Sequence, residues 1–468
     1  MIIARMAELR QSRPPGWHFI QTTRTEQFMA RKHLPRNAPC PCGSGKKYKQ
    51  CCLSKDEAAQ REAARVQAEA VRAITPSAAD LELPPLPEPP PRSPEEQACE
   101  VLWDEFTAAA PADQPPIFRR ALAEGLLDDE YAYEMLAELR DHAAPSLAGA
   151  LITELRDARP DLYQASVSYY LEWQIADALA QGRADLLPAL ADALAATAGD
   201  DLDMFYASSD RLAYHGQLAL IADTMRRAWP LVRASNKFVP GADEDFAAGA
   251  QQLTMLAYVA CEAAPRSDDP TLLAALEFFA PVDRALLAEL LALLTGQEDR
   301  PWERADRSED EQINRLSLRF QGEVYRAEHV PLTRGELGRV GLVNYIGERR
   351  EARREGTPRN WKKALGAPTA ASLLSPDYAS LNHFLAQRLN LLSSRFYEAA
   401  ATLELTPAWL RFLQAQELIT AEQCAATLRE LHRLVDEAAP IWQQHTSDLA
   451  VAEHIRVAWE RDKIPDAA

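Results

Sequence analysis

Helical stripes cut by Pro, Gly and Asp are the sequence feature that most constrains this fold. From Val101 to about Gly296, apolar residues recur at helical spacing between these breaks, and we find no convincing strand pair and no Asn-Gly hairpin signal. Ala and Leu, which enter helices at little cost, are abundant, whereas only 7% of the residues are aromatic. The sequence therefore predicts a mainly α fold.

The breaks recur at intervals of one to two helices, which is typical of stacked helical hairpins of the solenoid kind. They are Pro145, Pro160, Gly182, Gly199, Pro230, Pro240, Pro265 and Pro281. No repeat consensus stands out, so an irregular helical bundle is the alternative. We expect an α-solenoid-like, helical-repeat-like domain over residues 99–296 and a C-terminal, mainly helical domain over residues 297–467.

Several helix boundaries can be predicted from capping chemistry. Asp128 and Asp129 precede an apolar stripe and together give an N-cap signal. Pro281 and Gly296 open and close another helix, following the preference for Pro at the start and Gly at the end. The acidic run 243–245 is expected in a first helical turn, where carboxylates favour the helix dipole.

The C-terminal part is expected to hold strong helices. One apolar stripe is expected over Leu381, Leu385, Leu389, Leu392 and Phe396. Residues 414–434 and 441–459 supply further helices, and Pro407 and Pro440 are predicted to break them.

The N-terminal part has a different organisation. Residues 1–34 show little pattern, and Met29 is a candidate for the true start, with the preceding residues an upstream extension of the reading frame. Residues 35–53 hold a cysteine cluster, and residues 54–74 predict a polar helix. Eight prolines lie within residues 75–98, which indicates a semi-rigid linker of polyproline type.

Charge is divided unevenly along the chain. The formal net charge is −18, and residues 1–74 hold 14 Lys/Arg against 6 Asp/Glu, a balance of +8 that leaves −26 for residues 75–468. Phosphate would be repelled by most of this surface, so the chain as a whole is not expected to bind nucleic acid. RNA contact is expected, if at all, only through the basic head.

The cysteines and the hydropathy of the sequence indicate the cellular compartment of the protein. Four of the seven cysteines lie within 13 residues, which points to a reducing, cytoplasmic setting with one metal site rather than to a disulfide framework. Cys99, Cys261 and Cys424 are expected to be small buried apolar residues. We identify no secretory signal and no membrane span, and we expect no membrane association.

The cysteine cluster is the motif that carries chemistry. Cys40 and Cys42 are separated from the pair Cys51 and Cys52 by eight residues, GSGKKYKQ, which include turn-forming glycines. Four thiolates at this spacing can converge on one tetrahedral Zn²⁺, with Zn–S bonds of about 2.3 Å; Fe²⁺ is the alternative ion. Four protein ligands would close the site to catalysis, and the lysines between the pairs would offset its negative charge. Unpaired or oxidised thiols are the alternative to a metal site.

The run PRNAPCPCGSGKKYKQCC closely resembles the SEC-C motif, the zinc-binding motif named for the C-terminal tail of the SecA translocation ATPase. The resemblance covers residues 36–52 and departs at Ala38, where an acidic residue is common. It implies that Cys40, Cys42, Cys51 and Cys52 are the metal ligands. In SecA the tail contacts the SecB chaperone and ribosomes, so the resemblance implies a chaperone or ribosome partner, whereas translocase activity does not carry over to a body unlike SecA.

These features favour a zinc-binding cytoplasmic adaptor whose head docks on a macromolecular partner and whose helical body acts as a scaffold. The candidate partner-binding residues of the head are Arg36, Lys46, Lys47, Tyr48 and Lys49. The alternative is a helical enzyme or effector targeted by the zinc motif, which a deep polar pocket gathering Arg, His and carboxylates within residues 300–460 would favour. Ribosome or RNA association through the head alone is a third hypothesis.

Other signals carry no specific function. No catalytic residue is assigned, and the Gly45-Lys46 pair lacks the remainder of a phosphate loop, so we expect no nucleotide. The basic residues at 349, 350, 353 and 354, continued at 359, 362 and 363, favour an ion-paired, solvated helix because glutamates interleave with them; contact with RNA or an acidic partner is the alternative. His432 and His445 are expected on different helices.

Overall fold

The fold is described from a computed structural model. It describes residues 93–142, 145–297, 308–354, 373–389, 395–445 and 448–461. The described residues from Glu95 onward belong to one compact unit. The N-terminal segment with Met29, the cysteine motif, the polar helix 54–74 and linker residues 75–92 lie outside the described residues.

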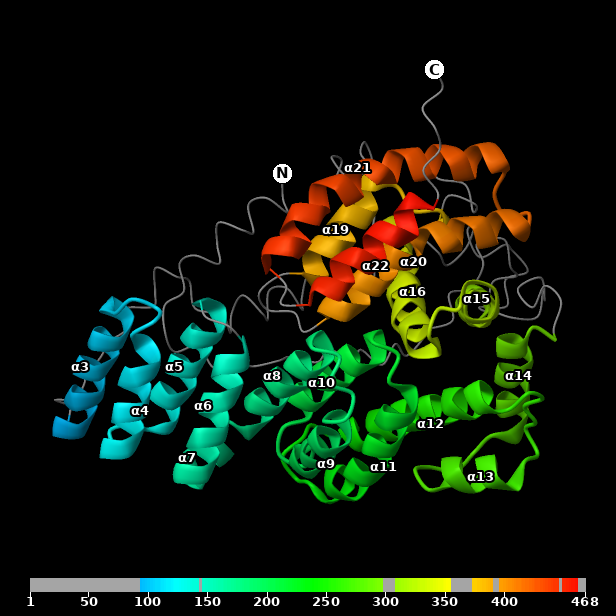
Figure 1. The fold of residues 1–468 in the computed structure, drawn as a ribbon. Helices are drawn as coiled ribbons and strands as arrows, with labels where there is room; N and C mark the ends of the chain where they lie inside the picture. Colours follow the sequence, from blue (N-terminus) through cyan, green and yellow to red (C-terminus); the bar gives the residue numbers. More distant parts are fainter. Residues whose placement is uncertain are drawn as a thin grey trace, which may run out of the picture. The chain divides into compact units, whose positions relative to one another are not determined.

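All regular secondary structure in the described residues is helical, which confirms the predicted mainly α fold. The first group of helices is α3 (Pro94–Ala108), α4 (Gln114–Glu124), α5 (Asp129–His142), α6 (Pro145–Ala158), α7 (Pro160–Ala165), α8 (Val167–Ala180), α9 (Leu187–Thr197), α10 (Leu202–Tyr214), α11 (Leu218–Ala234), α12 (Ala242–Cys261), α13 (Pro270–Glu277) and α14 (Arg284–Thr295). Many successive helices of this group contact each other, among them α5 and α6, and Figure 1 shows α3 to α6 in a row. Since α3 begins at Pro94, the last five residues of the predicted linker are helical.

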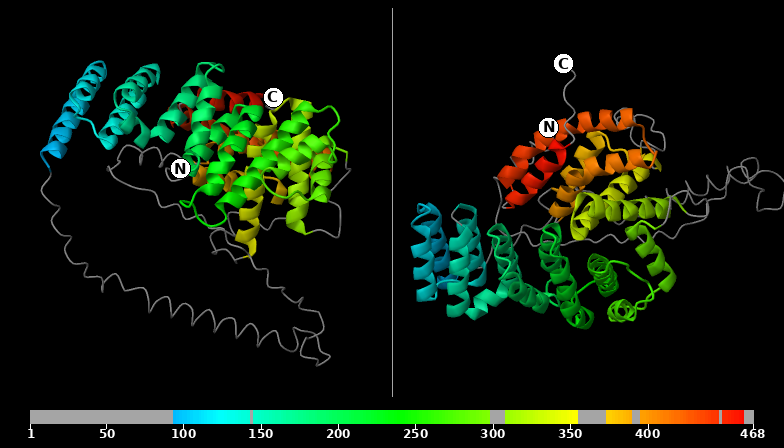
Figure 2. Two further views of the ribbon diagram at one scale, coloured as in Figure 1. Left: turned by 90° about the horizontal axis from the view of Figure 1, so that it is seen from below. Right: turned by 45° about the vertical axis from the view of Figure 1, so that its right-hand side comes forward.

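The second group of helices packs around α20. It consists of α15 (Glu309–Glu328), α16 (Leu332–Arg354), α19 (Tyr378–Arg388), α20 (Phe396–Ala415), α21 (Ala421–His445) and α22 (Leu449–Glu460). Residues 397–410 of α20 are all buried, so this helix is covered on every side. Helices α10 and α12 of the first group contact α16, and α10 also contacts α20; Figure 2 shows these elements from two further directions.

Capping chemistry sets several boundaries as predicted. The backbone N–H of Tyr131 donates to Asp128 Oδ1 at 2.8 Å, so Asp128 caps α5. Gly296 ends α14 with a positive φ of 79°, and the acidic run 243–245 lies in the first turn of α12. The start predicted at Pro281 is wrong, because the Asp283 side chain accepts from the N–H groups of Ala285 and Leu286, and α14 therefore begins at Arg284.

Three prolines predicted to break helices lie within them. Pro230 is inside α11, Pro407 inside α20, and Pro440 falls within the bounds of α21. At Pro407 the missing N–H leaves the carbonyl of Leu403 without its helical partner. The indole Nε1 of Trp459 donates to this carbonyl at 2.9 Å, so a side chain of α22 replaces the lost hydrogen bond.

The predicted C-terminal helix boundaries also need correction. The stripe expected from residue 381 to 396 is divided, because α19 ends at Arg388 and α20 begins at Phe396. The span 414–434 contains the end of α20 and the beginning of α21. The span 441–459 likewise joins the end of α21 to most of α22. Apolar spacing continues across these interruptions, so periodicity alone did not detect them.

Buried apolar side chains form four clusters within the described residues. Three of them lie, in turn, among helices α3 to α8, α8 to α12, and α12 to α16. The fourth serves α15 to α22 and also includes Tyr214 from α10. Cys99 and Cys424 are buried as predicted, whereas Cys261, the last residue of α12, is exposed. The division of the body near residue 296 stays a prediction.

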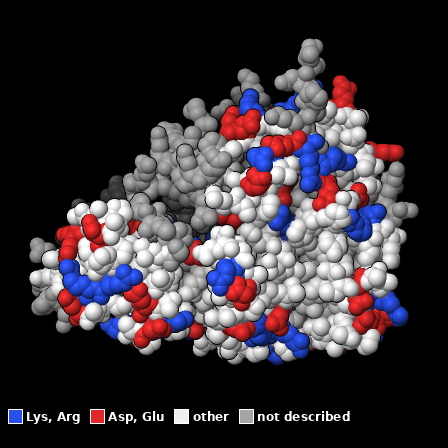
Figure 3. All heavy atoms as spheres, in the orientation of Figure 1, with Lys and Arg blue, Asp and Glu red and all other residues white. Residues whose placement is uncertain are grey.

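The surface of the body carries both signs of charge. On the face drawn in Figure 3, acidic and basic side chains are interspersed. Many arginines are held in ion pairs, such as Arg119 with Glu154 at 2.8 Å. In the part of the chain that the structure describes, no helix is both long enough and apolar enough to span a membrane.

Candidate functional site

The predicted metal-binding and partner-binding residues lie outside the described residues. They are the ligands Cys40, Cys42, Cys51 and Cys52 and the head residues Arg36, Lys46, Lys47, Tyr48 and Lys49. Across the described ranges, His, Cys, Asp and Glu side chains form no group of three or more that could hold a metal ion. Any site whose geometry the structure describes therefore lies in the helical body.

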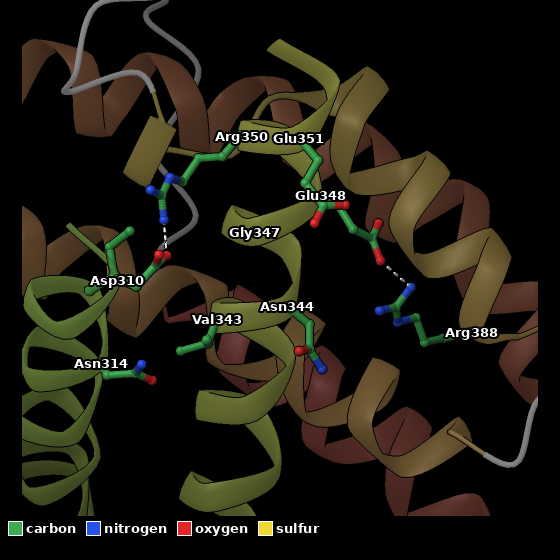
Figure 4. Close-up of a pocket in the computed structure, with 10 residues that line it drawn as sticks. Asp310, Asn314, Val343, Asn344, Gly347, Glu348, Arg350, Glu351 and Arg388 are labelled. Carbon is green, nitrogen blue, oxygen red and sulfur yellow. Dashed lines mark hydrogen bonds and ion pairs between the residues drawn. The ribbon is translucent and has the colours of Figure 1, made fainter. Parts of the chain in front are cut away.

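A polar cavity of about 300 Å³ lies where α15, α16 and α19 meet. Figure 4 shows the side chains that line it. Its lining residues are Asp310, Ile313, Asn314, Val343, Asn344, Gly347, Glu348, Arg350, Glu351 and Arg388. We call it the Gly347 cavity, because Gly347 lies between its two ion pairs (Figure 4).

The first ion pair joins α16 to the beginning of α15. Ser308 and Glu311 form a capping box, in which the Ser308 N–H donates to Glu311 Oε2 at 2.8 Å and the Glu311 N–H donates to Ser308 Oγ at 3.3 Å. This cap fixes the first turn of α15, which carries Glu309 and Asp310. The buried guanidinium of Arg350 donates to both carboxylates, with Nη2 3.0 Å from Glu309 Oε2.

The second ion pair joins α19 to α16. Arg388 Nη1 lies 2.7 Å from Glu348 Oε1, and its guanidinium lies over the Phe384 ring at 4.0 Å from the centroid. Arg388 Nε is 3.6 Å from Glu398 Oε1 of α20, which also accepts from Asn344 Nδ2 at 3.0 Å. These contacts fix the charged side chains around the cavity, which belong to α15, α16 and α19.

A separate buried network joins α10 to the second group of helices. Glu404 of α20 accepts from the Tyr214 hydroxyl at 2.7 Å and from Arg334 Nη1 at 3.1 Å. Arg334 Nε donates to the Tyr214 carbonyl at 2.7 Å, so one guanidinium connects α16 with both other helices. The three side chains satisfy one another in the interior, which fits a structural role for this network.

Asp448, just before α22, is the centre of a second set of buried contacts. Its Oδ2 lies 2.8 Å from His215 Nε2 and accepts from the Tyr397 hydroxyl at 2.9 Å. Burial opposes ionisation here, but the hydrogen bonds from His215 and Tyr397 keep the pKa of Asp448 below its ordinary value. Burial and the neighbouring Arg334 guanidinium lower the pKa of His454 on α22.

The carboxyl group of Asp210, in α10, has a raised pKa. Burial, followed by the negative charge of Glu398, raises the pKa of Asp210 to about 7. The positive charge of Arg395 opposes this shift.

The basic run that begins at residue 349 is ion-paired where it is described. Arg349 Nη2 lies 2.8 Å from Asp377 Oδ2, and its Nη1 donates to the carbonyls of Leu373 and Ser375. Arg349 and Arg350 both find partners outside their own helix, rather than the interleaved glutamates that the sequence suggested. The side chains at 353 and 354 and all of residues 355–372 lie outside the described residues.

Sequence reasoning missed the histidine of the buried network. His215 and Asp448 are 233 residues apart, and no local spacing connects them. The expectation that His432 and His445 lie on different helices is wrong, because α21 contains both. The Gly347 cavity gathers arginines and carboxylates within residues 300–460 but no histidine, so it meets only part of the criterion set for a helical enzyme.

Comparison with known proteins identifies one short segment. The SEC-C motif family profile matches residues 36–54. The chain is 71% identical over 28 residues to protein translocase subunit SecA of Desulforudis audaxviator and 73% identical over 26 residues to SecA of Campylobacter concisus. Each match covers 6% of this chain and 3% of the SecA chain.

A third relative is the uncharacterized protein YccF of Bacillus subtilis, which is 58% identical over 43 residues. This match covers 8% of this chain and 12% of YccF. No solved structure matches the chain. The chain therefore carries a SEC-C motif related to the zinc-binding motif of SecA, and the rest of it is unrecognised.

Proposed function

We propose that this protein is a zinc-binding adaptor whose SEC-C head docks on a macromolecular partner and whose helical body serves as a scaffold. The observation that carries the proposal is the match of residues 36–54 to the SEC-C motif. Relatives that share the motif include protein translocase subunits, which favours a partner connected with protein translocation. By the resemblance, that partner is a SecB-like chaperone or the ribosome.

The donor set suits a structural zinc ion. Cys40, Cys42, Cys51 and Cys52 would supply four thiolates, the softest common protein ligands, and would complete a tetrahedral shell with no position open for substrate. Zinc binding supplies about 10–16 kcal/mol of apparent folding free energy to peptides of this size, so the ion would give the head its shape. Fe²⁺ is the alternative ion for a four-thiolate site.

The charge of the head supports docking. Lys46, Lys47 and Lys49 lie between the two cysteine pairs, and the head is positive whereas the remainder of the chain is negative. Such a head would be steered towards an acidic surface without attracting acidic partners to the whole protein. A cytoplasmic location follows from this proposal, because reduced thiols are needed for the metal site.

The metal is tested first, on the full-length protein. We expect about one zinc ion per purified chain by elemental mass spectrometry, and less than a tenth of that in the Cys51→Ser/Cys52→Ser variant. Cys261→Ser is the matched control, since Cys261 is an exposed thiol of the body. A metal-free wild-type protein would refute the zinc site, and equal zinc in the double variant would refute these ligands.

Docking is tested with purified partners. Biolayer interferometry with immobilised full-length protein would measure binding of SecB chaperone and of ribosomes separately. We expect one of them to bind the wild type and the Cys261→Ser control, and to lose at least tenfold in affinity for the double variant. Equal affinity for all three proteins, or no binding of either partner to wild type, would contradict the docking role.

A further inference from the structure

Within the described residues, one titratable side chain next to Tyr214 has no partner of opposite charge. His454 of α22 is half-buried, and its ring centroid lies 5.7 Å from that of Tyr214. Its buried Nδ1 atom has no hydrogen-bond partner in the part of the chain that the structure describes. An imidazolium carries an N–H on both nitrogens, so protonation would leave a buried charged donor unsatisfied. The position therefore favours the neutral imidazole.

Three basic side chains of the surrounding network already have carboxylate partners. The pairs are Arg334 with Glu404 at 3.1 Å, His215 with Asp448 at 2.8 Å and Arg211 with Glu172 at 2.5 Å. These six side chains come from α8, α10, α16 and α20 and from the residue before α22, and none is more than 15% exposed. Because three basic groups meet three carboxylates, none of these carboxylates is left for His454.

The other titratable groups beside His454 do not supply a free negative charge. They are the Tyr214 hydroxyl of α10, the Tyr397 hydroxyl of α20 and the Glu453 carboxylate of α22. Burial raises the pKa of both tyrosines, so their hydroxyls stay neutral. Glu453 is exposed and is paired with Arg456 at 2.5 Å. On α21, which also packs against α22, His432 lies against the Trp459 ring.

From this arrangement we propose that His454 forms a pH-sensitive contact, which keeps α22 packed against α10 and α16 while its imidazole is neutral and loosens when the imidazole takes up a proton. Protonation places a second cation beside the Arg334 guanidinium, in an interior where charges are poorly screened. The buried apolar side chains of α22, Val451, Ile455 and Trp459, still favour packing. The proton therefore shifts the local opening equilibrium of α22 and does not unfold the whole chain.

The direction of the effect follows from the pKa of His454. Burial and the neighbouring Arg334 guanidinium lower this pKa in the folded chain, whereas an exposed histidine titrates near 6.5. Above about pH 6.5 the imidazole is neutral in both the packed and the open forms, and packing contributes in full. Below that pH the open form binds a proton that the packed form does not, so opening becomes more favourable. At pH 5 the increase in opening is limited to about thirtyfold, the protonated-to-neutral ratio of an ordinary histidine.

Hydrogen exchange of the α22 amides, followed by mass spectrometry on the full-length protein, measures this opening. After correction for intrinsic rates, we expect protection in α22 to fall at least about tenfold between pH 7 and pH 5. His454→Phe keeps a ring against Tyr214 but cannot bind a proton, so its protection should change by less than about threefold. His329→Asn is the matched control, because it removes an exposed histidine at a positive φ that asparagine tolerates, and it should behave as wild type.

The pH profile separates this role from a purely structural one. A substitution that only disturbs packing lowers protection by the same factor at both pH values and leaves the wild-type pH dependence in place, which would overturn the proposal. Equal protection of wild-type α22 at pH 5 and pH 7 would also overturn it. Asp210 titrates in the same range, but it is present in every variant, so its contribution cancels in the comparison. His454→Gln, which is neutral and polar, provides the same test if His454→Phe does not fold.

Discussion

The two faces of α16 show opposite uses of glycine. On the face towards α20, a Cβ at Gly338 would meet Leu405, and one at Gly341 would meet Thr402, so the absence of side chains lets two helices pack closely. On the face that lines the cavity, Gly347 lies against open space. The same residue type in one helix is therefore explained by a neighbouring helix in one case and by a vacant volume in the other.

The largest expected effect is on the α20 face. Gly341→Leu should lower the free energy of unfolding by about 3 kcal/mol, because an inserted side chain must displace the buried Thr402 and the α20 backbone. Urea denaturation followed by circular dichroism measures the loss. Gly347→Leu is the matched variant on the other face and should cost less than about 1 kcal/mol. Equal losses at the two positions would break the distinction between the faces.

The stability of the protein is expected to depend on pH through Asp210 of α10. The pKa of Asp210 is raised to about 7 by burial and by Glu398, whereas an unfolded Asp titrates near 4. Between these values the unfolded chain releases a proton that the folded chain retains, so the wild type loses stability as the pH rises from about 4 to 7. Asp210→Asn should remove that loss and be about 2 kcal/mol more stable than wild type at pH 8.

The comparison at pH 4 is the control for this prediction. There Asp210 is protonated in the folded state, so the wild type and Asp210→Asn should differ little. Urea denaturation at pH 4, 6 and 8 supplies the three points. Stability curves that run parallel over this range would show that Asp210 does not titrate as described.

Local chemistry explains which parts of this fold could be predicted from the sequence. The cap at Asp128 and the Gly296 terminus depend on residues within one helical turn, and both are present. The SEC-C motif was identifiable for the same reason, since all of its proposed ligands lie within 13 residues. Information of this kind is carried by spacing alone.

Contacts between distant residues explain what could not be predicted. Pro407 was expected to end a helix, and it does not, because Trp459 provides a donor for the carbonyl that the proline leaves free. His215 meets Asp448 only after α10 and α22 have packed together. The Gly347 cavity likewise needs α15, α16 and α19 in place, and no periodicity in the sequence distinguishes Gly347 from Gly341.

The contact at Pro407 leads to a smaller, testable effect. Trp459→Phe keeps most of the buried ring but removes the N–H that reaches the Leu403 carbonyl, and should cost about 1–2 kcal/mol of unfolding free energy. Pro407→Ala restores a backbone donor within α20. In a double-mutant cycle, Trp459→Phe should therefore cost less in the Pro407→Ala background. Additive losses would mean that the indole does not compensate for the proline.

The smallest expected effect on stability is at Gly347, on the face of α16 that lines the cavity. Gly347→Ala should raise the free energy of unfolding by about 0.5–1 kcal/mol, because alanine restricts the unfolded chain and its Cβ meets no atom within 4 Å. Gly249→Ala, in an exposed part of α12, should give a gain of the same size. If thermal denaturation showed a gain at Gly249 but a loss at Gly347, the space beside Gly347 would be occupied in solution, and the contrast between the two faces of α16 would fail.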